Sequence, residues 1–409
     1  MNGVYIEKPD RHEPGVTQRL DQARILIYSH DSFGLGHLRR CRAIAHSLVA
    51  QYKGVSVLIL SGSPIIGSFD FRARVDFVRI PGVIKLKDGE YTSLGLHIDL
   101  EQTLKMRESI IYHTAASFDP DVFLVDKEPT GLKGEVVSTL KMLKDRGSLN
   151  ILGLRDIMDE ASALKIEWQR KRVAPVLAEL YHHIWVYGLP QMGNPIAALD
   201  MPDNLEEKVT YTGYLYRDLP SDRNWLAPVN IDSSFILVTA GGGGDGEDLV
   251  DWVISAYETD RDIPYRAVIV TGPFMAQGQQ QAFHDRCNKI DKLEIIEFDN
   301  HIELLIVRAE AIIAMGGYNT FCEILSFDKK ALIVPRSVPR KEQLIRAQRA
   351  SEIGLISMID DDTAQNPEQM ANAIRRLPDQ LKPSAHAIDG LLDGLACIAR
   401  VIKDYLKSD

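Results

Sequence analysis

The chain has 409 residues, of which 45% are apolar and 25% charged, and this composition predicts an ordinary folded protein with room for two domains of about 150 to 200 residues each. Its net charge of −10 argues against general nucleic-acid binding, which needs clustered positive charge. Four scattered cysteines with no pair at CxxC spacing predict neither a zinc site nor a disulfide framework, and the absence of a long apolar run or secretory signal favours a cytoplasmic protein.

The ordered chain is predicted to open with a strand, a glycine loop and a helix. Residues 1–22 are charged and non-periodic, so we expect a flexible leader there. RILIYS at 24–29 predicts a buried strand, and the apolar spacing of the following segment predicts a helix that opens on Gly34, Leu35 and Gly36. His37 lies at its start. A histidine there is more often a surface or capping residue, but neutral imidazole can also serve as a general base.

A second group of polar residues follows a later strand. Residues 121–125 predict a strand, and Asp126, Lys127 and Glu128 come directly after it. In a doubly wound sheet they open onto the same crevice as His37, although charged residues also occur at strand ends because the chain emerges there into water. Before this strand, the polar segment 82–99 predicts either a lid over an acceptor or a plain mobile loop.

The rest of the first half continues as alternating strands and helices, which predicts an α/β domain over residues 23–214. The expected elements include strands at 55–60, within 75–82, and at 150–154, 184–187 and 208–212, with helices at 100–118, 135–144 and 161–181. Residues 215–232 hold two prolines and no period, and we interpret them as the linker between domains.

The second domain, 233–409, is predicted to begin as the first does. A strand at 235–239 precedes a glycine-rich loop with Gly242, Gly243 and Gly244, which would let the backbone approach a ligand closely. The loop lacks the Lys-Ser/Thr of a Walker motif and a convincing dinucleotide fingerprint, so ATP hydrolysis and NAD binding are not favoured. Ile302 starts a later helix, where it could pack on a nucleotide base or simply in the core.

The segment AIIAMGGYNTFCEILSFDKKALIVPRSVPRKEQLIRAQRA at 311–350 carries the most specific pattern. It predicts a strand, a turn at Gly316-Gly317, a helix over 319–327, and a second strand that ends at Pro335 before a basic loop. A helix that starts on glycines offers free backbone N–H groups to an anion, and the two strand ends face one crevice. The acidic run 360–362 is interpreted as a solvated turn and not as a metal site, and a final helix over 387–406 is long enough to return to the first domain.

This pattern resembles the donor half of GT-B nucleotide-sugar glycosyltransferases, and is most similar to the N-acetylglucosaminyltransferase of peptidoglycan synthesis. The resemblance implies two Rossmann-like doubly wound domains that face a central cleft. It implies a donor site in which the glycine turn faces the diphosphate, the glutamate holds the ribose, and the glutamine region holds the sugar. The positions that match, with the bordering glycine loop and base position, are Gly242, Gly243, Gly244, Ile302, Gly316, Gly317, Tyr318, Asn319, Thr320, Glu323, Arg340, Glu342 and Gln343.

The opening loop GLGHLRRC is also similar to that of the UDP-sugar hydrolase of pseudaminic acid synthesis, in which the histidine acts on the attacking water. The matching residue is His37. The first domain would then contribute His37 and Asp126 to catalysis, and Gly34, Leu35, Gly36, Lys127 and Glu128 to the acceptor side.

From these features we expect a metal-independent glycosyltransferase that uses a UDP-sugar, needs no cofactor, and acts on a glycan or a lipid-linked acceptor. A nucleotide-sugar hydrolase and a non-catalytic nucleotide-sugar binding protein are the alternatives. Pro64, Ile65 and Ile66, with nearby cations, could form an apolar tip that makes a peripheral contact with the inner membrane face, and a loop packed on its own domain is the other interpretation.

Overall fold

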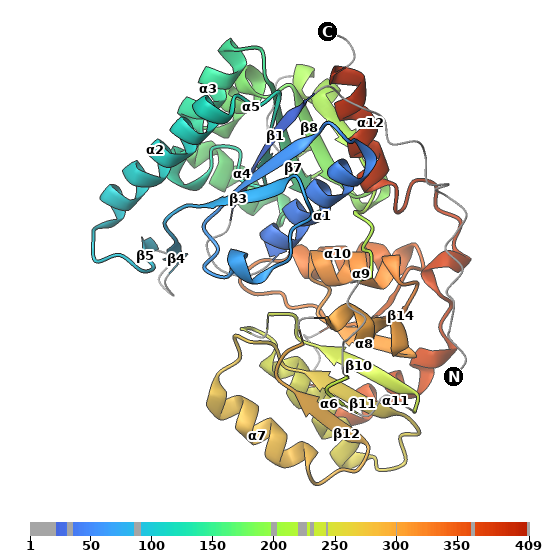
Figure 1. Cartoon of the computed structure of the whole chain (residues 1–409). Coiled ribbons are helices and arrows are strands. Elements are labelled where there is room, and N and C mark those ends of the chain that lie inside the picture. The colour runs from blue at the N-terminus through green and yellow to red at the C-terminus, as the bar shows by residue number, and fades with distance from the viewer. Residues whose placement is uncertain are drawn as a thin grey trace.

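The computed structural model describes residues 22–30, 36–85, 91–197, 203–219, 227–229, 233–242, 244–299, 301–360 and 365–406. Within them the chain forms two parallel sheets, one in the upper and one in the lower half of Figure 1. The predicted two-domain α/β architecture is confirmed. Of the predicted leader, 1–21 lie outside the described residues.

The first sheet has the strand order β3-β2-β1-β6-β7-β8-β9, with every neighbouring pair parallel. Its strands are β1 (Arg24–Ser29), β2 (Ser56–Ser61), β3 (Val75–Arg79), β6 (Val122–Asp126), β7 (Leu149–Arg155), β8 (His183–Tyr187) and β9 (Val209–Tyr211). Its helices are α1 (Gly36–Gln51), α2 (Leu100–Phe118), α3 (Val137–Asp145), α4 (Ala161–Arg170) and α5 (Val173–Leu180). The central strands are continuous apolar runs because α1 covers one face while α2, α3 and α5 cover the other.

The second sheet repeats this plan with the order β12-β11-β10-β13-β14-β15. Its strands are β10 (Phe235–Thr239), β11 (Arg266–Val270), β12 (Leu293–Ile296), β13 (Ala311–Ala314), β14 (Lys330–Ile333) and β15 (Ser357–Met358). Its helices are α6 (Glu247–Thr259), α7 (Gln277–Cys287), α8 (Ile302–Arg308), α9 (Tyr318–Ser326), α10 (Glu342–Glu352) and α11 (Pro367–Arg376). In Figure 1, α8, α9 and α10 lie between this sheet and the first domain.

The strand order reverses once in each sheet, between β1 and β6 and between β10 and β13. Open α/β sheets bind ligands at such switch points, beyond the carboxyl ends of the strands. His37 follows β1, and Asp126 ends β6. The glycine loop follows β10, and Gly316-Gly317 follows β13. The topology therefore places these four predicted segments at the two switch points.

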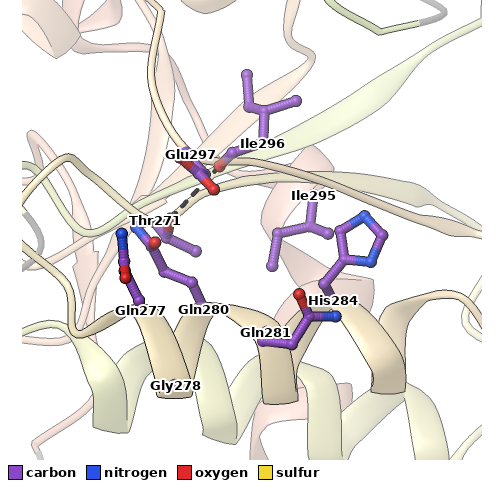
Figure 2. Close-up of a pocket in the computed structure, with 9 residues that line it drawn as sticks. All are labelled: Thr271, Gln277, Gly278, Gln280, Gln281, His284, Ile295, Ile296 and Glu297. Atoms are coloured by element: carbon purple, nitrogen blue, oxygen red, sulfur yellow. Dashed lines mark hydrogen bonds between the residues drawn. The ribbon is translucent and has the colours of Figure 1, made fainter.

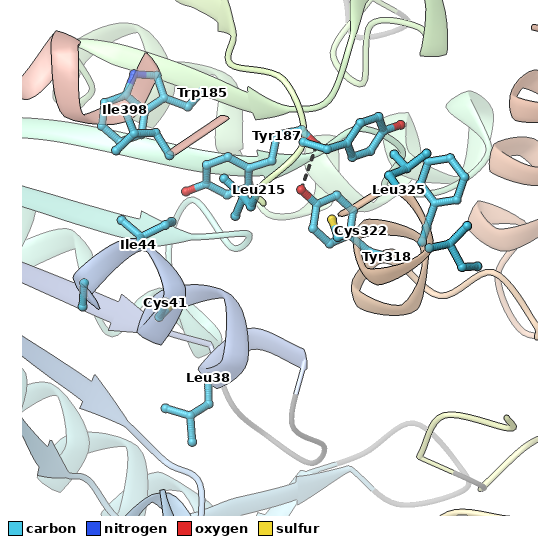
Figure 3. Packing of buried hydrophobic residues seen from close by; sticks show 14 of the residues in the cluster. Leu38, Cys41, Ile44, Trp185, Tyr187, Leu215, Tyr318, Cys322, Leu325 and Ile398 are labelled. Atoms are coloured by element: carbon cyan, nitrogen blue, oxygen red, sulfur yellow. Dashed lines mark hydrogen bonds between the residues drawn. The ribbon is translucent and has the colours of Figure 1, made fainter. Parts of the chain in front are cut away.

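One apolar cluster extends across both domains. Figure 3 shows Cys41 of α1 and Tyr187 of β8 in the same region as Tyr318 and Cys322 of α9. The Tyr318 hydroxyl donates a hydrogen bond of 2.9 Å to the carbonyl of Tyr187. The domains therefore share buried apolar surface as well as polar contacts.

The last helix, α12 (Gly394–Leu406), packs on the first domain. The hydroxyl of Tyr52 donates to the carbonyl of Ala399 at 3.0 Å, and the hydroxyl of Tyr405 donates to the carbonyl of Gly147 at 2.8 Å. Figure 3 shows Ile398 of this helix beside Trp185 of β8.

Three sequence predictions about local structure are wrong in detail. The segment 82–99 contains a short antiparallel hairpin, β4 (Val83–Lys85) and β5 (Tyr91–Ser93). The helix expected over 161–181 is two helices, because Arg172 adopts a left-handed conformation with φ of 50°. The final helix begins at Gly394 and not at 387.

Burial describes two further segments, the expected linker and the expected apolar tip. Leu215 and Arg217, at the start of the expected linker, are buried, while 220–226 and 230–232 lie outside the described residues. Ile66 of the expected apolar tip is also buried, which leaves Ile65 exposed at 39%. Of the described helices, none is sufficiently long and apolar to cross a membrane.

Candidate active site

The first-domain site centres on His37 and Asp126. His37 is the second residue of α1, and its Nδ1 lies 2.5 Å from Oδ2 of Asp126, the last residue of β6. The predicted neighbourhood of these two side chains is therefore present in the structure. If Nδ1 carries the proton and donates to the carboxylate, the other ring nitrogen, Nε2, is left with the lone pair that a general base requires.

Arg40 holds Asp126 from the other side. Its Nε donates to Oδ1 at 2.8 Å and its terminal nitrogen donates to Oδ2 at 2.6 Å, so the contact is bidentate. Burial raises the pKa of Asp126, but the charge of Arg40 and the hydrogen bond from His37 outweigh it and leave that pKa below its ordinary value. The carboxylate stays ionised beside the imidazole.

Burial also governs the two histidines of this region. It lowers the pKa of His37, and the hydrogen bond and charge of Asp126 oppose that effect without reversing it. His30, at the end of β1, packs edge-on against His37 with ring centroids 5.9 Å apart, and burial lowers its pKa to about 3. Both rings are therefore neutral near pH 7.

The other predicted acceptor-side residues surround this pair. Glu128 is buried and accepts a hydrogen bond of 2.7 Å from Lys171, while Lys127 is half-buried beside it. The carbonyl of Gly36 accepts a hydrogen bond of 3.1 Å from Asn319 of the second domain. Gly34 and Leu35 lie outside the described residues.

In the second domain a cavity of about 470 Å³ lies beside the glycine loop that follows β10. Gly244 and Asp245 line it from the loop after β10, Met315 lines it from the end of β13, and Arg336 lines it from the loop after β14. Gly242 lies in the same glycine loop, exposed beside Phe274, and Gly243 lies outside the described residues. Carboxyl ends of three strands thus contribute to one hollow.

Gly316 and Gly317 differ in what surrounds their Cα atoms. Gly316 has a φ of 79°, and a Cβ there would lie 2.7 Å from the side chain of Ile333, so the position requires glycine. Gly317 precedes the first turn of α9, and a Cβ there would meet no heavy atom within 4 Å. The backbone at this helix start is therefore accessible to a ligand.

The predicted donor residues of α9 make contacts to the first domain. Asn319 bonds to Gly36 and accepts from Arg217 at 2.9 Å, and Thr320 is half-buried in the first turn. Glu323 is buried and pairs at 2.7 Å with Arg39 of α1, which also pairs with Glu303. Burial and the charge of Glu303 raise the pKa of Glu323 although Arg39 opposes them. Ribose binding at Glu323 therefore requires this pair to rearrange.

Tyr318 lies in the core between two guanidinium groups. The ring centroid is 5.5 Å from Cζ of Arg40 and 5.7 Å from Cζ of Arg346, on opposite domains. The side chain is buried, and its hydroxyl is bonded to Tyr187. Any contact of Tyr318 with a donor would be made by its backbone.

The loop between β14 and α10 is held by charged groups on both sides. Arg340 contacts Glu167 at 3.2 Å in the first domain. Glu342 is buried and accepts from Arg336 at 2.9 Å, and the Gln343 side chain accepts from the backbone N–H of Arg336 at 3.3 Å. Ile302, expected near a nucleotide base, is partly buried and packs against the apolar cluster.

Three site residues were missed by sequence reasoning. Arg39 and Arg40 follow His37 directly in the quoted motif, so their position in the helix was a usable signal, but their partners lie in distant segments. Arg155 is the last residue of β7, and sequence reasoning gave it no role. Its position beside the end of β6 comes from the pairing of β6 with β7, which a single sequence does not show.

A second hollow of about 610 Å³ lies between α7 and the edge of the second sheet (Figure 2). Gln277, Gln280, Gln281 and His284 line it from α7, and Thr271 and Glu297 line it from the strand ends. The Thr271 hydroxyl donates to the carbonyl of Ile296 at 3.5 Å. This hollow is outside the His37 region and none of the predicted site residues lines it. Among the described residues, no group of three His, Cys, Asp or Glu side chains could hold a metal ion.

Comparisons with known proteins agree with the two-domain α/β fold. Residues 235–388 match the glycosyltransferase family 28 C-terminal domain. The match lies within the second domain. An uncharacterized glycosyltransferase of Methanosarcina acetivorans is 23% identical over 353 residues, which cover 84% of this chain and 87% of that protein. The family 28 match and this relative support sugar transfer from a nucleotide sugar.

Solved structures show that the chain has the GT-B fold. MurG of Acinetobacter baumannii has a TM-score of 0.57 at 11% identity, over 95% of this chain and all (100%) of that chain. A protein of Listeria monocytogenes described as a UDP-N-acetylglucosamine 2-epimerase has a TM-score of 0.61 at 12% identity, over 95% and 98% of the two chains. At these identities the likeness establishes the fold alone.

Proposed function

We propose that this glycosyltransferase moves a hexosyl or N-acetylhexosaminyl group from a UDP-sugar to an acceptor hydroxyl, without a metal ion or another cofactor. The observation that supports the proposal best is the 2.5 Å contact between His37 and Asp126 at the first switch point. It gives the first domain a positioned base opposite the family 28 domain.

In this proposal Nε2 of His37 takes the proton of the acceptor hydroxyl. The acceptor oxygen forms a bond to the anomeric carbon, the bond from that carbon to the diphosphate breaks, and the leaving diphosphate keeps the electron pair. Asp126 stabilises the imidazolium that forms, and Arg40 keeps Asp126 in place. The first turn of α9 and the glycine loop offer backbone N–H groups to the leaving diphosphate.

The acceptor in this proposal is a glycan or a lipid-linked intermediate that enters beside Lys127 and Glu128. A peripheral contact with anionic lipid at the inner membrane face is part of the proposal. Because Ile66 is buried, the remaining apolar tip is essentially Ile65, and we expect any such contact to depend more on nearby cations than on apolar insertion.

The first test replaces His37 by alanine. Turnover should fall by a factor of about 10² to 10⁴, the contribution of positioned proton transfer, while affinity for UDP should stay the same. His113→Ala, at an exposed position on α2, is the control. A His37→Ala enzyme with full activity would show that another group is the base.

The second test separates transfer from hydrolysis. The GLGHLRRC loop resembles that of a hydrolase, so reaction with water in place of the acceptor is the alternative. Incubation with UDP-sugars in the absence of acceptor should release little free sugar if transfer is the reaction. Rapid release that is lost in His37→Ala would identify a hydrolase instead.

A further inference from the structure

Two cations lie side by side at the carboxyl ends of neighbouring strands. Lys127 directly follows β6, and Arg155 is the last residue of β7. The strands pair in parallel with Asp126 opposite Gly153, and the backbone N–H of Lys127 donates to the carbonyl of Gly153 at 2.8 Å. Both side chains are half-buried, next to the residue that holds His37.

Neither cation has a partner among the described residues, whereas the nearby carboxylates do. Asp126 pairs with Arg40, Glu128 with Lys171, and Asp156 with Arg346. Nε of Arg155 is buried and has no hydrogen-bond partner in the described structure. Both cations are half-buried, so each loses part of its hydration without gaining an ion-pair partner in the described structure.

The pKa values of both groups reflect burial and neighbouring cations, which together outweigh the nearby carboxylates. Burial, followed by the charge of Arg155, lowers the pKa of Lys127 to about 8. Burial, followed by the charge of Arg346, lowers the pKa of Arg155 to about 10. The charge of Lys127 also contributes to the low pKa of His37, which shows that the two groups interact.

The backbone of Lys127 is strained in the same place. Its φ is 70°, a left-handed value that is unfavourable for a residue with a side chain, and the N–H of Glu128 bonds back to the carbonyl of Asp126 at 2.9 Å. Such backbone strain is concentrated at functional sites.

We propose that Lys127 and Arg155 form an anion subsite beside His37, and that the acceptor carries a carboxylate or phosphate group that binds there. The assignment of this anion to the acceptor rests on the proposed function, whereas the anion subsite itself does not. An anion supplies the missing partner for both cations and brings the acceptor hydroxyl to the dyad. The diphosphate of the donor is the other source of such an anion.

The subsite can be tested without turnover by using pyridoxal 5′-phosphate as a reagent on the full chain. Its phosphate would occupy the subsite, and its aldehyde would condense with the unprotonated amine of Lys127, release water and form an imine. Borohydride then delivers hydride to the imine carbon, and the stable amine is located by mass spectrometry. We expect selective labelling of Lys127 over the exposed Lys53, and protection by inorganic phosphate.

Variants and a neutral reagent make the test specific. Arg155→Met should reduce labelling of Lys127 by about ten- to a hundredfold, as expected for lost bonds to a charged group, and Arg155→Lys should retain part of it. Arg170→Met, an exposed position on α4, should have no effect. Pyridoxal, which lacks the phosphate, should not distinguish Lys127 from Lys53.

The outcomes decide between the interpretations. Equal labelling by pyridoxal and its phosphate would overturn the subsite. UDP at ten times its dissociation constant should leave labelling unchanged, and protection by UDP would assign the subsite to the donor and overturn the acceptor assignment. Arg155→Met should melt at the same or a higher temperature, and a strongly lowered melting temperature would show that Arg155 is structural. Because labelling needs no turnover, the anion subsite would stand even if the protein proved to have no transfer activity.

Discussion

At the scale of single residues, Asp126 controls both the orientation and the basicity of His37. It fixes Nδ1 by a 2.5 Å contact, and its charge raises a pKa that burial lowers. The net pKa is below the ordinary value of about 6.5, so the imidazole that we propose as the base is already neutral at pH 7. The rate should therefore rise with pH only in the acidic range and be level above it.

Asp126→Asn should change this profile in a defined direction. The amide removes the negative charge that raises the pKa of His37, so the rising limb of kcat/KM should move to lower pH. Turnover should also fall, although less than in His37→Ala, because the imidazolium loses its counter-ion. The measurement is the pH profile of both variants. Asp76→Asn, on the exposed side of β3, is the control, and an Asp126→Asn limb at higher pH would contradict the assignment.

At the scale of elements, the sequence predicted those parts whose signals are local. Helix α2 matches its predicted range because Asp99 caps its first turn by accepting from Gln102 N–H and Asp119 ends it in a left-handed conformation. The break at Arg172 was missed although Pro175, in the first turn of α5, was a usable signal for it. The hairpin β4–β5 was missed because each strand has only three residues.

In the candidate site, contacts that follow from the order of strands were predicted, and contacts between distant segments were missed. The neighbourhood of His37 and Asp126 followed from the switch-point rule, which needs only the order of strands. The pairs Arg39–Glu323 and Arg346–Asp156 join different domains, and nothing local in the sequence indicates them. The sequence predicted that residues such as Asn319 bind the donor, but it gave no sign that they also contact the first domain.

The junction between α12 and the first domain supports a prediction about stability. A Cβ on Gly394 would lie 2.6 Å from the carbonyl oxygen of Tyr214 and 2.7 Å from that of Gly213, so the backbone would have to move. Gly394→Ala should lower the free energy of unfolding by about 1 to 3 kcal/mol, the usual effect of overpacking. Gly278→Ala on α7 meets no neighbour within 4 Å and should leave stability unchanged or slightly higher. Equal urea midpoints for the two variants would show that the junction adapts.

At the scale of the whole molecule, the domains are joined through the helices that border the candidate donor site. Arg346 of α10 donates to both oxygens of Asp156, at 2.6 and 2.8 Å, and to the carbonyl of Gly316 at 3.1 Å. Asp156 also accepts from Tyr214 at 2.8 Å. One buried ion pair thus connects the end of a first-domain strand to the glycine turn of the second domain.

This connection leads to a prediction for a double-mutant cycle. Asp156→Asn or Arg346→Met alone leaves one buried charge without its partner, and each should lower the free energy of unfolding by about 3 to 5 kcal/mol. The double variant should lose clearly less than the sum, because neither charge remains and the residues are in contact. Urea denaturation of the four proteins measures the coupling.

The same helix offers a matched control for that cycle. Arg349 also reaches the first domain, but it donates to the neutral carbonyl of Met192 at 2.9 Å, so Arg349→Met should lower the free energy of unfolding by only about 1 kcal/mol. If Asp156→Asn and Arg346→Met were simply additive, the pair would not couple the domains. In Arg346→Met the Gly316 carbonyl also loses its hydrogen-bond donor. We therefore expect UDP affinity to weaken more in Arg346→Met than in Arg349→Met.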